Sequence, residues 1–450
     1  MFDKSTIQKL IIAAMGVGLI SIPASAAPSA DSSYIFNTLL FLIGGFLVMW
    51  MAAGFAMLEA GLVRSKNVAE ICLKNVSLYA LACIMWMVMG YNLMYAGVDG
   101  GYLGSFMMPW APDDAASLID GATIDPTGYS AGSDFFFQMV FVATTASIVS
   151  GTVAERIKLF PFLIFTAILA GIIYPIQGSW EWGGGWLNSE GFASTFGAEF
   201  SDFAGSTLVH STGGWAALTG AIILGPRLGR YTGGGIKPMP GSSMPLATLG
   251  TFVLWVGWFG FNGASQLALG TINDAISVSN IFVNTNMAAA GGAMAAVLVT
   301  KFVYKKVDLS MALNGALAGL VSITAGPLTP LPLEATLIGG VGGALVVFAV
   351  PFLDRLKIDD VVGAISVHLV CGIWGTLAVA FTDGATTFMA QLAGVIAIGA
   401  FVVLTSATAW LALKHTVGIR LEAEDEDRGS DLAELGMEAY PEFGTGSQKF

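Results

Sequence analysis

The chain contains 450 residues, of which 55% are hydrophobic and only 11% are charged, and its formal net charge is −12. Soluble domains carry about 25% charged residues, so this composition excludes an ordinary soluble domain, and the negative net charge gives no sign of nucleic-acid binding. The three cysteines form neither a C-x-x-C pair nor a disulfide framework, and we expect no metal ion and no cofactor.

Residues 1–26 have the pattern of a signal peptide. Two lysines precede an apolar run from Leu10 to Ile22, and Ala24-Ser25-Ala26 forms a cleavage sequence of small residues. A first membrane helix is the alternative, but the run is shorter than the roughly 20 residues that cross a bilayer. We therefore expect the mature chain to begin near Ala27, outside the cytoplasm.

Eleven apolar segments follow, each close to the roughly 20 residues that a membrane-spanning helix requires. Helix is expected throughout, because an open sheet cannot satisfy its backbone hydrogen bonds in lipid. We predict an all-α polytopic membrane domain over residues 27–415 and a polar tail over 416–450. The expected spans are residues 34–63, 70–97, 133–153, 159–178, 202–225, 244–269, 279–303, 309–327, 335–354, 361–382 and 389–414.

The placement of lysine and arginine predicts the orientation of these segments. Every basic residue of the mature chain lies in alternate connections or in the tail, on one side, and basic connections stay in the cytoplasm. We therefore expect a periplasmic N-terminus and a cytoplasmic C-terminus in a bacterial inner membrane. The connections without lysine or arginine are 98–132, 179–201, 270–278, 328–334 and 383–388.

The tail becomes polar from Gly418 and contains an acidic run from Glu422 to Asp427. A run of like charges favours a solvated segment. A regulatory contact with the inner face of the protein, or with a partner, is the alternative interpretation.

One pattern, D-x-x-G-x-x-x-V-H-x-x-x-G, occurs at residues 202–214 and again at 360–372. Asp202 and Asp360 each stand at the start of a segment, where a carboxylate is expected to cap the helix. With the orientation above, Asp202 begins its segment at the outer face and Asp360 begins its segment at the cytoplasmic face. The pattern therefore predicts an inverted repeat.

The two halves of this repeat are residues 34–225 and 244–382, and the segment 389–414 is extra. In such repeats the substrate path lies between the halves, near the middle of the membrane.

The same pattern places His210 and His368 inside apolar segments, where a polar side chain is costly and usually functional. A core histidine bonded to a neighbouring carbonyl is the alternative for either residue, but two in matching positions favour a functional pair. Neutral imidazoles offer donors and acceptors without a fixed charge. Such a path suits a small polar molecule that loses its charge at the entrance.

Aromatic residues are candidates for that entrance. Trp182 lies in the connection before the first histidine segment, and Phe141, Trp258 and Phe261 lie in apolar segments, with Ser265 nearby. Aromatic faces hold a cation with about 0.5–2 kcal/mol, and a serine oxygen can accept a hydrogen bond from it. The alternative is interfacial and lipid-facing packing, which is common for these residue types.

Seven short motifs carry a resemblance to a known family. In them the chain is similar to the ammonium transporter family (Amt/MEP/Rh), nearest to its bacterial Amt branch, over nearly the whole mature chain. The motifs are G-L-V-R-S-K-N at 61–67, F-Q-x-x-F at 137–141, A-E-R-I at 154–157, W-G-G-G at 182–185, D-F-A-G-x-x-x-V-H at 202–210, G-W-F-G-F-N at 257–262 and V-H at 367–368.

The resemblance implies a homotrimer with one pore in each subunit, a role in nitrogen uptake and no enzymatic activity. It also implies a PII-type regulatory protein as a partner at the cytoplasmic face. The roles implied are an outer ammonium site of Trp182, Phe141 and Ser265, a gate of Phe141 and Phe261, paired pore histidines His210 and His368, a wall residue Trp258, and supporting carboxylates at Asp202 and Asp360.

The expected mechanism is recruitment of ammonium outside, deprotonation near the gate and passage of ammonia along the histidines, with the proton moved separately. Two alternatives remain open. A sensor related to this family would detect ammonium without moving it, and a membrane redox protein would use the two histidines as axial haem ligands.

Overall fold

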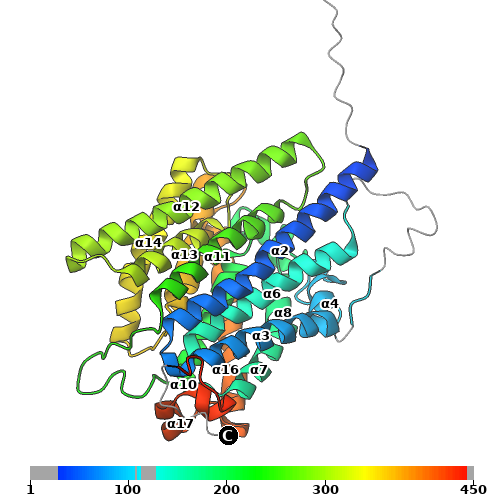
Figure 1. The fold of residues 1–450 in the computed structure, drawn as a ribbon. Helices are drawn as coiled ribbons and strands as arrows, with labels where there is room; N and C mark the ends of the chain where they lie inside the picture. The colour runs from blue at the N-terminus through cyan, green and yellow to red at the C-terminus, as the bar shows by residue number, and fades with distance from the viewer. Residues whose placement is uncertain (1–28, 107–108, 113–127, 443–450) are drawn as a thin grey trace, which may run out of the picture.

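The computed structural model describes residues 29–106, 109–112 and 128–442, and in these ranges the chain is almost entirely helical (Figure 1). The expected signal peptide lies outside the described residues. The α-helices are α2 (Ala30–Leu62), α3 (Val68–Met85), α4 (Tyr91–Tyr95), α6 (Ala131–Val153), α7 (Leu159–Ile168), α8 (Tyr174–Ser179), α9 (Glu190–Phe196), α10 (Thr212–Leu224), α11 (Met244–Gly263), α12 (Ile272–Tyr304), α13 (Leu309–Ile323), α14 (Pro332–Arg355), α15 (Cys371–Thr382), α16 (Phe388–Thr416) and α17 (Ala423–Arg428).

Short π-helical turns extend several of these helices. The turn η2 (Trp86–Gly90) joins α3 to α4, and η3 (Leu169–Ile173) joins α7 to α8. The turns η5 (Ser206–Ser211) and η7 (Ile365–Val370) lead into α10 and α15, and they contain the two segment histidines. Such turns inside helices occur frequently at functional sites.

Ten of the described helices, counted with their joined turns, are long and apolar enough to cross a membrane. The expected span at 309–327 forms α13, whose 15 residues rise only about 22 Å, less than the roughly 30 Å of a bilayer core. The all-α polytopic class is confirmed for the described part of the chain. The total of eleven spans, the inverted repeat and the orientation stay predictions.

One expected connection is wrong for most of its length. The segment predicted to begin at residue 279 begins at Ile272, because Thr271 and Asp274 form a reciprocal cap at the start of α12. The Thr271 amide donates to the Asp274 carboxylate at 2.9 Å, and the Asp274 amide donates to the Thr271 hydroxyl at 3.1 Å. A polar first turn of this kind is helical without being apolar.

The helices approach one another closely where glycines face each other. Helix α2 packs along α11, and α12, α13 and α14 form a group beside them (Figure 1). A Cβ added at Gly343 of α14 would lie 2.0 Å from the carbonyl oxygen of Gly292 in α12. In lipid, close packing of small residues replaces apolar burial as the force that holds helices together.

This contact gives a stability prediction with a matched control. Gly343→Ala should lower the unfolding free energy by about 1–3 kcal/mol, because the new methyl group forces α12 and α14 apart. Gly340→Ala, in the same helix, should have little effect, because its nearest atom would be 3.8 Å away. Thermal unfolding of the detergent-solubilised protein measures both, and equal melting temperatures would contradict the packing account.

The tail contacts the membrane domain, while Glu422, Glu424 and Asp427 of its acidic run are exposed, so the solvated interpretation holds for those three side chains. The tail lies against one end of the helices, shown in red at the bottom of Figure 1. The Lys158 backbone amide donates to the Ile419 carbonyl at 2.9 Å, and the Leu421 backbone amide donates to the Arg156 carbonyl at 3.0 Å. Glu426 is buried and accepts from the Leu228 amide at 2.6 Å. The alternative, contact with a face of the protein, holds.

Two further carboxylates of the tail cap helices of the membrane domain. Asp431 accepts from the amides of Ala69 and Glu70 at 3.0 and 2.8 Å, in the first turn of α3. Glu434 accepts from the amide of Leu159, the first residue of α7, at 2.9 Å. These amides have no partner inside their own helices, and a negative charge there also interacts favourably with the helix dipole.

A buried ion cluster lies beside the tail. The Arg227 guanidinium donates to both oxygens of Asp359, at 2.8 and 2.9 Å, and to Glu155 at 3.1 Å. Burial alone would raise the pKa of Asp359, but the hydrogen bonds of Arg227 and the charges of Arg156 and Arg227 hold this pKa well below its usual range. The cluster ties together three connections at the same end of the molecule.

The capping contacts give a second prediction. Asp431→Asn should loosen the tail, because an amide has one acceptor oxygen and would turn a donor toward one of the two capped amides. We expect limited proteolysis within the tail to become several-fold faster. Glu424→Gln, at an exposed position of α17, is the control and should leave the rate unchanged. Identical rates for Asp431→Asn and the unmodified chain would show that the cap does not hold the tail.

Candidate functional site

Two half-helices start at buried carboxylates, and each carries one of the segment histidines. Asp202 accepts four backbone hydrogen bonds, from Gly205, Ser206, Thr207 and Leu208, at 2.7–3.1 Å. Gly205 has a φ of 107°, a conformation that favours glycine, and it lets the chain turn into η5. All the donors of this helix start are therefore satisfied without water.

The second half-helix repeats this arrangement. Asp360 accepts from the amides of Ala364, Ile365 and Ser366 at 3.1, 2.8 and 3.4 Å. It also accepts from the Thr152 hydroxyl of α6 at 2.9 Å, and Gly363 has a φ of 83°. The repeated sequence pattern thus corresponds to a repeated local structure.

The two histidines meet in the interior. Nδ1 of His210 and Nδ1 of His368 are 3.2 Å apart, and the side chains are buried, at 0% and 3% exposure. Because only one of the two Nδ1 atoms can donate, the neutral rings must be opposite tautomers. Nε2 of His210 has no hydrogen-bond partner among the described residues, so it is free to bind a guest molecule.

An aromatic stack covers His210 on its other side. The ring of Phe261 lies 5.2 Å from that of His210, and the ring of Phe141 stacks on Phe261 at 4.1 Å. Trp258 stacks on His210 at 5.0 Å, and its Nε1 donates to the Thr324 hydroxyl at 2.9 Å. The two phenylalanines close the direct route from the next cavity to the histidines.

A cavity of about 460 Å³ opens on the far side of the phenylalanines. Trp182, Phe141 and Ser265, three residues predicted from the sequence, line it together. The Trp182 ring meets that of Phe141 edge-on at 6.0 Å, and its Nε1 donates to the Asp202 carbonyl at 3.0 Å. The Ser265 hydroxyl donates to the Phe261 carbonyl at 2.8 Å, which leaves its oxygen able to accept a bond from a guest.

Several polar residues of this cavity were missed in the sequence as site residues. They are Tyr91, Tyr95, Tyr129, Asp134, Gln138, Glu181 and Asn188. The helical spacing of Asp134, Gln138 and Phe141, at i, i+4 and i+7, is a signal that could have found two of them. Tyr91 and Tyr95 are likewise an i, i+4 pair on α4, whereas Tyr129 comes from another part of the chain and no local pattern connects it with them.

Glu181 is the most unusual of these side chains. One of its oxygens accepts from the Asp202 amide at 2.7 Å, and the other has no partner among the described residues. Burial, together with the neighbouring charge of Asp202, raises the pKa of Glu181 well above its usual range. The cavity therefore combines aromatic faces with carboxyl groups, as expected for a site that receives a small cation.

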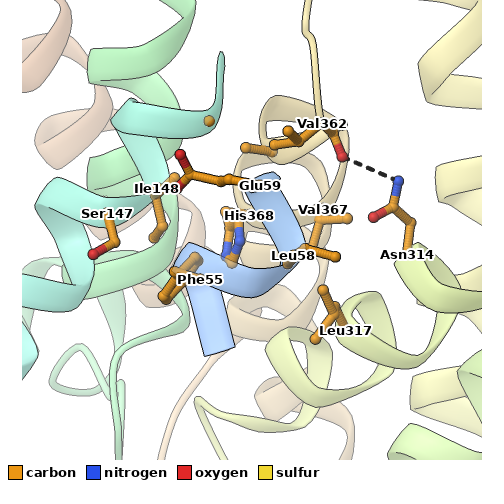
Figure 2. Close-up of a pocket in the computed structure, with 13 residues that line it drawn as sticks. Phe55, Leu58, Glu59, Ser147, Ile148, Asn314, Leu317, Val362, Val367 and His368 are labelled. Carbon is orange, nitrogen blue, oxygen red and sulfur yellow. Dashed lines mark hydrogen bonds between the residues drawn. The ribbon is translucent and has the colours of Figure 1, made fainter. Parts of the chain in front are cut away.

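A second, much smaller pocket lies on the other side of the histidines (Figure 2). It has about 10 Å³ of free space for the centre of a water-sized molecule, which is close to the minimum for one water. His368, Phe55 and Glu59 line it, together with Asn314 and Val362. The wide cavity, the phenylalanine pair, the two histidines and the narrow pocket therefore adjoin one another in this order.

The model of the Ammonium Transporter Family matches residues 39–440. The chain belongs to this family. It is 39% identical to the ammonium transporter Amt2 of Archaeoglobus fulgidus, over 97% of this chain and 96% of that protein. It is 32% identical to the ammonium transporter of Bacillus subtilis, over 90% of this chain and 98% of that protein.

Solved structures of the ammonium transporter family share the fold. The structure named Sensor Amt Protein superposes with a TM-score of 0.80 at 35% identity, covering 90% of this chain and 99% of that one. Mep2 of Candida albicans superposes with a TM-score of 0.75 at 28% identity, covering 92% of each chain. The predicted family is therefore confirmed, and with it an ammonium transporter function.

The alternative of a haem protein does not fit the histidines. Two axial ligands must approach an iron from opposite sides, whereas these two rings contact each other directly through their Nδ1 atoms at 3.2 Å. Trp258 and Phe261 pack against His210, and Phe55 lies 6.1 Å from His368. Among the described residues, a porphyrin between the rings would have to separate two side chains that are in direct contact.

The cap of the first half-helix gives a third prediction. Asp202→Asn should destabilise the fold by about 1–3 kcal/mol and displace His210, because one amide oxygen cannot accept four backbone bonds and the new donor opposes them. Asp360→Asn is the comparison and should cost less, since its carboxylate accepts three backbone bonds and the Thr152 hydroxyl can reorient.

Thermal unfolding measures this difference, and transport by the surviving protein reports the position of His210. If Asp202→Asn lowers the unfolding free energy no more than Asp360→Asn does, the number of capped amides does not determine the stabilisation.

Proposed function

We propose that this transporter, which is not an enzyme, takes up ammonium in the wide cavity, removes its proton and conducts ammonia along the histidine pair. The observation that carries the proposal is the direct contact of two buried imidazoles immediately behind a stacked phenylalanine pair. Such a path offers no compensation for a desolvated charge, so the molecule that crosses must be neutral.

Recruitment rests on Trp182, Phe141 and Ser265. Two aromatic faces attract the cation by about 0.5–2 kcal/mol, and the Ser265 oxygen accepts one of its hydrogen bonds. The carboxyl groups of Asp134 and Glu181 line the same cavity and add attraction whenever they are ionised. Asp202 supports this site through its backbone, since its carbonyl oxygen holds the Trp182 ring.

Deprotonation occurs beside Phe141 and Phe261. The rings must move apart for ammonia to pass, and the ammonia then accepts or donates hydrogen bonds at the free Nε2 of His210. The proton follows separately along polar groups or transient water. Potassium has no proton to lose, so the apolar path rejects it, and the net movement is that of ammonium.

A sensor is the second candidate, favoured by two observations. The structure named Sensor Amt Protein is similar over 90% of this chain, and the tail contacts the membrane domain. Uptake in a transporter-deficient strain distinguishes the two functions. Absence of growth rescue, with good expression in the membrane, would favour sensing.

Assembly and location are further parts of the proposal. Exposed apolar side chains on α2 and α12, such as Phe46, Trp50 and Leu298, suit lipid and the neighbouring subunits of a homotrimer. The basic connections support the bacterial inner membrane, a periplasmic N-terminus after a signal peptide, and a cytoplasmic C-terminus. A PII-type regulatory protein would meet the face on which the tail lies.

The histidine pair supplies the fourth prediction. His210→Ala combined with His368→Ala should reduce ammonium-elicited current at least about tenfold or admit potassium, because the alanines remove every polar atom that guides ammonia and open space for a hydrated ion. Current on a solid-supported membrane after an ammonium jump measures the first effect, and a potassium jump measures the second.

Phe381→Ala is the control, since this exposed side chain lies on the outer surface of α15 and should leave both currents unchanged. Normal current without potassium entry in the double variant would remove the histidines from the mechanism.

A further inference from the structure

Glu59 is a buried carboxyl group at the opposite end of the histidine path from the ammonium cavity. It belongs to the last turn of α2, is 1% exposed and lines the narrow pocket together with His368. Figure 2 shows the two side chains at this pocket, Glu59 from α2 and His368 from η7. We propose that Glu59 is the proton-exchange site at which ammonia leaving the histidines becomes ammonium again.

The hydrogen bonds of Glu59 leave one oxygen for a guest. Its Oε2 accepts from the Ser150 hydroxyl of α6 at 2.7 Å and from the Asn75 amide of α3 at 3.3 Å. Its Oε1 has no hydrogen-bond partner among the described residues, although it is fully buried. Buried carboxyl oxygens without a partner are rare, because losing water without a replacement bond is unfavourable.

The side chain also has no ion pair of its own. The nearest lysine is Lys74, whose ammonium pairs with Glu70 at 3.7 Å and donates to the Ser150 carbonyl at 3.4 Å. Among the described residues no lysine or arginine pairs with Glu59. Without ammonium, burial favours the protonated form of this carboxyl group. When ammonium forms beside it, the carboxylate gains a counter-ion and its charged form is stabilised.

The size of the pocket fits this exchange. Its free space accepts a single molecule of the size of water or ammonia, and both His368 and Glu59 line it. Gly151 of α6 allows this approach, since a Cβ there would lie 2.4 Å from the Val362 side chain and 3.5 Å from Cγ of Glu59. The remaining wall is largely apolar. Among the described residues that line the pocket, Glu59 has the one carboxyl group.

The proton balance closes with ammonium as the only proton source. Ammonium in the wide cavity gives ammonia and a proton, and the proton that travels separately adds to the Glu59 carboxylate. Ammonia arriving from His368 takes this proton, an N–H bond forms as the O–H bond breaks, and ammonium and the carboxylate result. The inference rests on the proposed function and adds the site where ammonia and proton recombine.

The test compares three variants with the unmodified chain by current on a solid-supported membrane. Glu59→Gln keeps an acceptor oxygen for Ser150 and Asn75 but cannot exchange a proton, and we expect its ammonium current to fall about tenfold or more. Glu59→Asp keeps the carboxyl group and should retain clearly more current than Glu59→Gln. Glu424→Gln, the same exchange at an exposed position of α17 outside the pocket, should be unaffected.

The outcomes separate a failure of the proposed transport function from a failure of the role assigned to Glu59. No ammonium transport by the unmodified chain would overturn the proposed function itself. Transport by the unmodified chain with a normal current in Glu59→Gln, or with equal losses in Glu59→Gln and Glu59→Asp, would overturn only the role of Glu59.

A second measurement observes the protonation of the carboxyl group directly. Infrared difference spectra of the unmodified protein, recorded on exchanging potassium for ammonium, should contain a band of a protonated carboxyl group that shifts in Glu59→Asp. A spectrum without any carboxyl band would also overturn the assignment.

Discussion

The structure depends on two carboxylates that hold the starts of two helices inside the membrane domain. A helix start exposes amides without partners, and lipid offers no water to satisfy them. Asp202 and Asp360 accept those amides, and glycines with positive φ turn the chain into each half-helix. The histidines follow at matching positions, so the two caps together bring their Nδ1 atoms to 3.2 Å. The position of the pair is therefore set by the backbone, independently of any ligand.

The distribution of charge along the path follows from this arrangement. Carboxyl groups stand at both ends, Asp134 and Glu181 in the wide cavity and Glu59 in the narrow pocket, and the described side chains between them are aromatic or imidazole. A cation is attracted at either end but finds no compensating charge in the middle. Under the proposed mechanism, only a guest that exchanges its proton uses both ends, and this would distinguish ammonium from potassium.

Hydropathy and the repeated pattern predicted the helical class, both histidines and the helix-capping aspartates, because these signals are local. The start of α12 was missed because a polar capping box is helical without being apolar. The tyrosines of the wide cavity and the free oxygen of Glu59 depend on which helices meet, and no single segment contains that information. The W-G-G-G motif predicted Trp182 as a site residue. The position of its ring depends on a hydrogen bond to the Asp202 carbonyl, which follows η4 (Trp186–Asn188) and α9 in the chain.

The net charge of −12 suggests an acidic surface, but several of the acidic side chains form contacts inside the fold. Asp431 and Glu434 of the tail cap α3 and α7 in the same way as Asp202 and Asp360 cap the half-helices, and Asp359 pairs with Arg227. A carboxylate is well suited to each place because one group accepts several backbone bonds and complements the helix dipole. The tail is thus held by the same interaction that positions the histidines, although three acids of its acidic run, Glu422, Glu424 and Asp427, stay exposed.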